Sequence, residues 1–166
     1  MSLIDIAQSI SDSPIGSAIA ESAIVFPVLE GSHLVGLAIS IGLLFITDLR
    51  LLGLFLKQVP VDKVLQQLRP WVLGGFAITF LTGGLLFWAE AATLITNPAF
   101  PVKLVFIAIA GVNALVFEAR LGRRAAEWAA LPKPPAAVRF AAAASLTSWT
   151  VVVIAGRLIP YLGTVG

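Results

Sequence analysis

The sequence predicts an all-α fold: an integral membrane four-helix bundle with a short interfacial N-terminal helix. Hydrophobic residues make up 58% of the chain and charged residues only 12%. A soluble domain carries about 25% charged residues, so the expected solvent is lipid rather than water. Four long apolar stretches, separated by prolines and charged segments, are each long enough to cross a bilayer. With 166 residues, the chain has room for one bundle and no separate soluble domain.

Residues 1–29 are predicted to form an interfacial amphipathic segment. Apolar residues such as Leu3 fall on one side of a short helix, and Asp5 falls on another. Ser13 followed by Pro14 then supplies an N-cap and a first-turn proline for a second short helix. The alternative role for this segment is a docking arm for a partner protein.

Residues 30–166 are predicted to form the transmembrane bundle. Its first helix is expected over residues 31–56, because the core of this stretch has no charged side chain. The second helix is expected over residues 70–93, because a proline such as Pro70 suits the first turn of a helix.

The other two spans follow sequence signals that break a helix. Asn97 and Pro98 predict that the third helix begins directly after them and runs over residues 99–121. The fourth helix is predicted over residues 136–162, after a proline-rich segment.

The distribution of basic residues predicts the orientation. Of the 11 Lys and Arg residues, all except Lys103 and Arg157 lie in or beside the connections between helices one and two or between helices three and four. The positive-inside rule then places both connections in the cytoplasm. The prediction is a multi-pass protein of the bacterial inner (cytoplasmic) membrane, with the lipid bilayer as its main partner and both termini on the periplasmic side.

Small residues predict how the helices pack. Burial of apolar surface does not drive association in lipid, so close backbone packing must hold the bundle together. The second helix contains Gly75-xxx-Thr79-xxx-Gly83, and the first contains Gly36-xxx-Ser40. These stripes predict tight contacts between helices.

His33 is the main candidate functional residue, because an ionisable side chain within a span is rare and often functional. Five residues are predicted at a similar depth near the outer face: Glu30, Trp88, Glu90, Lys103 and Arg157. Of these, Glu30, Trp88 and Arg157 are, with His33, the expected cofactor-binding residues. The imidazole can ligate the iron of heme b or hydrogen-bond a quinone carbonyl, and Arg157 can pair with a propionate or another anion. The plain alternative is that His33 only forms a hydrogen bond near the lipid headgroups.

The residue counts restrict the cofactor chemistry. His33 is the expected metal ligand, and it is the only histidine in the chain. Heme would therefore need a second His33 across a homodimer, a ligand from another membrane subunit, or five-coordinate iron. The absence of cysteine excludes thiolate ligands and disulfides.

These observations favour a small, non-catalytic, redox-associated membrane subunit with a heme- or quinone-binding pocket. One alternative is a transport component in which Asp48, Asn113 and His33 form a proton or ion path. Another is a structural accessory subunit that packs against a larger membrane complex. No Ser-His-Asp set, phosphate loop or paired catalytic carboxylates is visible, which disfavours an enzyme. The net charge of +2 gives no reason to expect a nucleic acid partner.

Several motifs resemble an uncharacterised bacterial family of small four-helix membrane proteins, a domain of unknown function. They are Glu30-x-x-His33-Leu34-x-Gly36, Asp48-Leu49-Arg50-Leu51-Leu52-Gly53, Pro70-Trp71, Thr82-Gly83, Asn97-Pro98-x-Phe100-x-x-Lys103, Gly111-x-Asn113, Trp149 and Gly156-Arg157. The chain also resembles, distantly, the membrane domain of copper-resistance protein D and the four-helix b-type cytochromes. Copper handling needs Met, His or Cys ligands. Only Met1 and His33 are present, so copper export by this chain alone is not expected.

Overall fold

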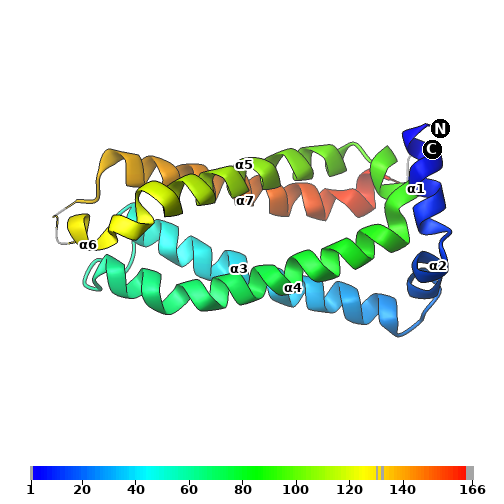
Figure 1. Ribbon diagram of the computed structural model, residues 1–166, viewed down its shortest axis with the longest axis horizontal. Helices are drawn as coiled ribbons and strands as arrows, with labels where there is room; N and C mark the ends of the chain where they lie inside the picture. Colours follow the sequence, from blue (N-terminus) through cyan, green and yellow to red (C-terminus); the bar gives the residue numbers. More distant parts are fainter. Residues whose placement is uncertain (1, 130, 132, 164–166) are drawn as a thin grey trace.

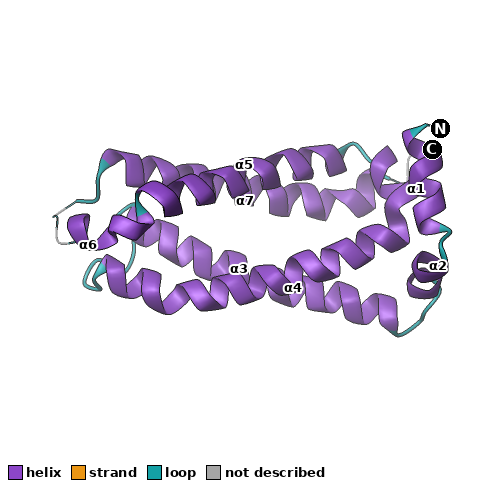
Figure 2. Ribbon diagram, in the orientation of Figure 1, coloured by secondary structure: helices purple, strands orange, loops and turns teal. Residues whose placement is uncertain are grey.

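The computed structural model describes residues 2–129, 131 and 133–163, and within them every regular element is a helix (Figure 2). Among these residues, four helical stretches are long and apolar enough to cross a membrane. They are α3 (Val25–Leu51), α4 (Val61–Thr96), α5 (Ala99–Arg120), which continues through η1 (Gly122–Arg124) and α6 (Ala125–Trp128), and α7 (Ala136–Leu162). The all-α part of the fold class is confirmed, whereas insertion into a bilayer stays a prediction.

The long helices form two antiparallel pairs, α3 with α4 and α5 with α7 (Figure 1). The connection between α3 and α4 and the connection between α5 and α7 lie at the same end of the molecule. The short helices α1 (Leu3–Ser11) and α2 (Pro14–Ala20) lie across the other end, where α7 also finishes. Nine of the 11 basic residues lie in or beside these two connections, and therefore toward one end of the bundle.

α3 spans residues 25–51 rather than the predicted 31–56. Pro27 lies in its first turn, where proline is tolerated because the first N–H groups of a helix have no intrahelical partner. The helix stops early because Gly53 adopts a left-handed φ of +74°. The N–H groups of Gly53 and Leu54 then donate to carbonyls of the last helical turn, which is the glycine-based Schellman stop.

α4 spans residues 61–96, so the predicted range of 70–93 is wrong at both ends. Pro70 lies inside the helix, although it removes one backbone hydrogen bond there. The preceding turns stay helical because Val61 is buried in the apolar cluster at this end of the bundle. A break at Glu90, with φ −121° and ψ 21°, divides α4 near its C-terminal end.

The bounds of α5 and α7 agree with the predicted ranges to within one residue. Asn97 explains why the turn before α5 is well defined. Its side-chain oxygen accepts a hydrogen bond from the N–H of Ala99 (2.9 Å), and its amide nitrogen donates to the carbonyl of Ile159 in α7 (2.7 Å). One buried side chain thus bonds the first N–H group of α5 and ties this turn to α7.

α3 and α4 approach closely where small residues meet. A methyl group added to Gly75 would lie 2.8 Å from the backbone nitrogen of Ser40, and one added to Gly36 would lie 2.8 Å from Thr79 Oγ1. Both distances are well inside van der Waals contact, so the two backbones can meet only because these residues are glycine. The packing role predicted for the small-residue stripes of α3 and α4 is confirmed.

Two serine side chains attach the N-terminal helices to α4. The indole N–H of Trp88 donates to Ser13 Oγ (2.9 Å), and the backbone N–H of Ala92, just after the break in α4, donates to Ser11 Oγ (3.2 Å). Ser13 is also the N-cap of α2, as the sequence predicts. The break in α4 therefore provides a backbone donor for the N-terminal segment.

α1 begins with a capping box formed by Ser2 and Asp5. Ser2 Oγ accepts a hydrogen bond from the N–H of Asp5 (3.1 Å), and the N–H of Ser2 donates to the Asp5 carboxylate (2.6 Å). This second bond stabilises the ionised carboxylate and lowers the pKa of Asp5.

Candidate functional site

Two cavities lie between the α3–α4 pair and the α5–α7 pair. One has a volume of about 520 Å³ and is lined by His33; we call it the His33 cavity. The other has a volume of about 220 Å³ and is lined by Asp48; we call it the Asp48 cavity. The side chains of Phe76 and Trp149 line both, with ring centroids 4.8 Å apart. An aromatic pair therefore contributes to the walls of a histidine site and of a carboxylate site.

His33 is oriented by α4. Its Nδ1 lies 2.9 Å from the carbonyl oxygen of Thr79 and 3.2 Å from Thr82 Oγ1. A carbonyl oxygen only accepts hydrogen bonds, so Nδ1 carries a proton and donates it to Thr79. Thr82 Oγ1 donates in turn to the carbonyl of Ile78 (2.7 Å). In the neutral imidazole this arrangement leaves Nε2 as a hydrogen-bond acceptor.

The His33 ring occupies space that only glycine leaves open. A methyl group at Gly83 would lie 2.9 Å from Cε1 and 3.3 Å from Nδ1 of His33. The same addition at the neighbouring Gly84 would meet nothing within 4 Å. The lack of a side chain at Gly83 therefore allows the imidazole to pack against α4. Gly83 lies on the same helical stripe as Gly75.

α5 contributes a cationic group, Lys103, to the lining of the His33 cavity. Lys103 is half-buried, and its Nζ lies 3.6 Å from the place that a methyl group on Gly156 of α7 would take. Within the described residues, no carboxylate forms an ion pair with it. The stacked rings of Phe87 and Phe100, with centroids 5.7 Å apart, belong to the same lining. The cavity thus combines aromatic walls with one ammonium group and one imidazole.

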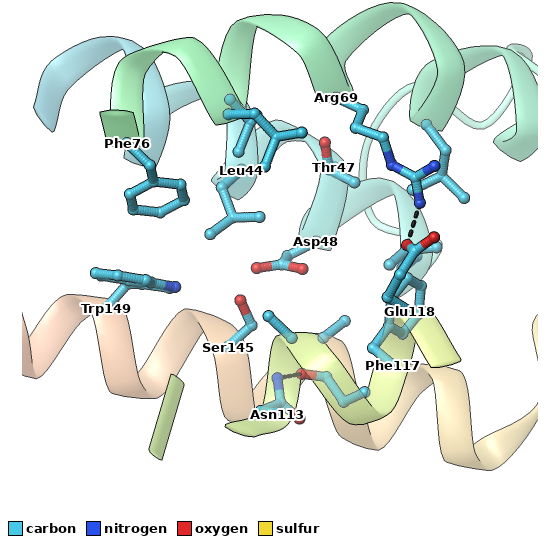
Figure 3. A pocket seen from close by; sticks show the side chains of 17 residues that line it. Leu44, Thr47, Asp48, Arg69, Phe76, Asn113, Phe117, Glu118, Ser145 and Trp149 are labelled. Atoms are coloured by element: carbon cyan, nitrogen blue, oxygen red, sulfur yellow. Dashed lines mark hydrogen bonds and ion pairs between the residues drawn. The ribbon is translucent and has the colours of Figure 1, made fainter. Parts of the chain in front are cut away.

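The Asp48 cavity contains a buried carboxylate. Asp48 is 4% exposed, and its Oδ2 has no hydrogen-bond partner among the described residues. Figure 3 shows the carboxylate pointing into the space between the helix pairs, with the hydroxyl of Ser145 turned toward it. Leaving a buried acceptor unpaired costs about 1–3 kcal/mol, and more if the group is charged.

An ion pair between Arg69 of α4 and Glu118 of α5 lies at the rim of the Asp48 cavity (Figure 3). The two side chains are 49% and 40% exposed, so the pair faces out of the bundle. Thr47 and Asn113 also line this cavity, and each donates a hydrogen bond to a backbone carbonyl (2.9 and 3.0 Å). Their donors are therefore already in use.

Of the four residues predicted to bind a cofactor, only His33 belongs to the lining of the His33 cavity. Arg157 donates to the hydroxyl of Tyr161 (2.7 Å) and lies 4.9 Å from the centroid of that ring. Trp88 is bonded to the segment between α1 and α2, and Glu30 is exposed. The structure does not bring these three side chains into the cavity that His33 lines.

No group of three or more His, Cys, Asp or Glu side chains in the described part of the chain could hold a metal ion. The role of His33 as a metal ligand stays a prediction. Asp48 and Asn113, predicted to share a proton or ion path with His33, line the same cavity as each other, whereas His33 lines the second one.

The sequence identifies His33, Asp48 and Asn113 as candidate polar groups and places Lys103 at the depth of His33, but it does not show how these side chains are oriented. It assigns Thr79 to a packing stripe, but nothing in the local pattern indicates that its carbonyl orients His33. It assigns Arg69 to a connection, because it expects the second helix to begin at Pro70. With the earlier start of α4, Arg69 is helical and meets Glu118.

The comparisons with known proteins identify a family. Residues 15–162 match a family described as a family of unknown function, DUF6644. The chain belongs to this family. No curated protein and no solved structure matches the chain.

The DUF6644 segment contains every residue that lines the two cavities and leaves out α1. The resemblance to a family of unknown function is thereby confirmed. The more distant likeness to copper-resistance protein D and to b-type cytochromes stays a prediction.

Proposed function

We propose that this DUF6644 protein is a multi-pass protein of the bacterial inner membrane that binds a quinone in the His33 cavity, as a non-catalytic subunit of a redox system. Four long apolar helices support the membrane location. Both basic connections lie at one end of the bundle, and the positive-inside rule assigns that end to the cytoplasm. Both chain termini then lie on the periplasmic side.

The observation that carries the proposal is the presence of His33 and Lys103 on one apolar, aromatic cavity. Small-molecule sites are typically about 300–1,000 Å³ and combine apolar walls with a few polar groups. At about 520 Å³ the His33 cavity falls within this range. A ring-shaped ligand with polar atoms at its edge suits such a lining.

A quinone supplies the polar atoms that these two side chains need. The Lys103 ammonium group can donate to a quinone carbonyl, and such a charge-assisted hydrogen bond is stronger than a neutral one. Nε2 of His33 can accept a hydrogen bond from the hydroxyl of the reduced quinol. Because the Nδ1 proton is bonded to Thr79, the imidazole offers Nε2 to the ligand.

Heme b is supported less well than a quinone. An Nδ1–H bonded to a carbonyl is also usual for a metal-bound histidine, so the orientation of His33 alone suits both. Lys103 lines the same cavity and could donate either to a quinone carbonyl or to a heme propionate, so it does not decide between the two. The chain has only one histidine, however, so bis-histidine ligation would need a second chain.

Titration of the purified protein in lipid nanodiscs with a short-chain ubiquinone tests the proposal. Quinones quench indole fluorescence, and Trp149 lines the cavity, so saturable quenching is expected. Lys103→Met keeps the side-chain length and removes the charge. We expect it to weaken binding about tenfold, or ~1.4 kcal/mol, the scale of one hydrogen bond to a charged group. Lys57→Met, in the connection between α3 and α4, is the matched control.

Two results would count against the quinone site. One is equal quinone affinity in the wild type and in the double variant His33→Ala, Lys103→Met. The other is a Soret absorption band in gently purified protein that disappears in His33→Ala, which would assign the cavity to heme. The structural accessory role and the transport role stay predictions beside this proposal.

A further inference from the structure

The carboxylate of Asp48 lacks a partner that would balance its charge. Asp48 is 4% exposed, and Oδ2 has no hydrogen-bond partner among the described residues. The cation that lines the same cavity, Arg69, is paired with Glu118 instead. None of the ion pairs in the described ranges includes Asp48. A carboxylate in such surroundings is strongly destabilised unless a proton or another cation joins it.

The space beside this carboxylate is larger than a proton or a single water molecule needs. The Asp48 cavity has a volume of about 220 Å³, whereas one water molecule occupies about 30 Å³ in the liquid. Figure 3 shows Asp48 between two ends of this space. Phe76 and Trp149 lie toward one end, and the Arg69–Glu118 pair lies at the other.

The chemistry of the lining favours an organic cation over a metal ion. A hard metal ion takes about six oxygen ligands. Besides Asp48, the oxygen groups of the lining belong to Thr47, Asn113, Ser145 and Glu118, and Glu118 is already paired with Arg69. No group of three or more His, Cys, Asp or Glu side chains within the described residues could hold a metal ion. The remainder of the wall is mostly aliphatic or aromatic, and aromatic faces attract ammonium groups.

We propose that the Asp48 cavity binds a small organic cation, a protonated amine with an apolar body. Its nitrogen lies at the Asp48 carboxylate, and its body lies against Phe76 and Trp149. The N–H group of the amine supplies the donor that Oδ2 lacks, and its charge balances the buried carboxylate. Phe76 and Trp149 also line the His33 cavity, but the Asp48 carboxylate lines only this one, and the proposal does not depend on the quinone proposal.

The Arg69–Glu118 pair is placed to control entry to this site. An ion pair with side chains 49% and 40% exposed contributes only about 0–1 kcal/mol, so it opens at little cost.

Benzylammonium is a suitable probe, because benzyl alcohol has nearly the same shape without the charge. In calorimetric titrations of the full chain in nanodiscs near neutral pH, we expect saturable benzylammonium binding and roughly tenfold weaker binding of benzyl alcohol. Asp48→Asn keeps the shape and removes the charge, so it should weaken benzylammonium binding roughly tenfold or more. Asp62→Asn, in the first turn of α4 and outside the cavity, should bind like the wild type.

A second variant keeps the test decisive if Asp48→Asn does not fold. Ala114→Leu narrows the cavity from its exposed side, leaves Asp48 intact, and should also weaken benzylammonium binding. The proposal is overturned by unchanged affinity in folded Asp48→Asn, by equal affinity of the wild type for the two probes, or by no saturable binding. These titrations contain no quinone, so their outcome is distinguishable from that of the quinone experiment.

Discussion

At the level of single residues, the two cavities differ in the atom that each leaves available to a ligand. His33 donates from Nδ1 to Thr79 and keeps Nε2, whereas Asp48 keeps an unpaired Oδ2. The two residues lie on one helix, roughly 22 Å apart at 1.5 Å per residue. α3 therefore supplies the main polar group of both cavities, a neutral acceptor in one and a carboxylate in the other.

Gly83→Ala should displace the His33 ring, because the added methyl group would lie 2.9 Å from Cε1. We expect the bond from Nδ1 to Thr79 to weaken and the free energy of unfolding to fall by about 1–3 kcal/mol, the usual range for overpacking. The chain has one histidine, so its imidazole ¹⁵N and ¹H NMR signals are unambiguous. The NMR signal of the Nδ1 proton should shift, and this proton should exchange faster with water.

Gly84→Ala is the matched control for this change, since a methyl group there meets nothing within 4 Å. Its imidazole signals should match those of the wild type. If Gly83→Ala and Gly84→Ala gave the same histidine spectrum, the contact between Gly83 and His33 would be wrong.

At the level of elements, α3 and α4 meet backbone against backbone at Gly36 and Gly75. Gly75→Ala places a methyl group 2.8 Å from the backbone nitrogen of Ser40, and a backbone cannot move aside as a flexible side chain can. We expect the α3–α4 pair to separate, with a loss of about 1–3 kcal/mol in the free energy of unfolding. Unfolding by SDS in mixed micelles, followed by far-UV circular dichroism, measures this change.

Gly74→Ala provides the comparison from the adjacent position, where the added methyl group meets open space. Alanine favours a helix over glycine by up to about 1 kcal/mol, so Gly74→Ala should be neutral or slightly stabilising. A loss of stability as large as that of Gly75→Ala would mean that the stripe through Gly75 does not form the α3–α4 interface.

The elements also show which signals the sequence carries and which it lacks. The start of α5 is predictable because Asn97 acts locally on Ala99, and the packing stripes are predictable because small residues recur at helical spacing. The start of α4 is not predictable in this way, because Pro70 locally favours the first turn of a helix, whereas the turns before it are helical and Val61 in them is buried by tertiary packing. His33 is recognisable as a rare ionisable group, but its partners on α4 follow from tertiary packing alone.

At the level of the whole molecule, the cavities follow from the pairing of the helices. α3 and α4 meet through glycine with almost no space between them, and α5 and α7 are tied by hydrogen bonds from Asn97 and Asn113. Both cavities are lined by residues from both pairs. Close packing within the pairs thus leaves the space for ligands between them.

The chain contains no cysteine, so single introduced cysteines can test the arrangement of the whole molecule in a membrane. Gln58→Cys lies in the α3–α4 connection, Ala126→Cys in α6, and Ser9→Cys in α1, and all three positions are exposed. In intact bacterial spheroplasts, a membrane-impermeant maleimide should label Ser9→Cys alone. The other two should react only after the membrane is permeabilised, because the positive-inside rule places the basic connections in the cytoplasm.

The pattern of labelling separates two errors. If Gln58→Cys and Ala126→Cys reacted from outside and Ser9→Cys did not, the fold would stand and only the orientation would be inverted. If Gln58→Cys and Ala126→Cys reacted from opposite sides, the connections of the two helix pairs would not share one face of the bilayer. The cavities between the pairs could not then exist as described, because they require α3, α4, α5 and α7 to run side by side across the membrane.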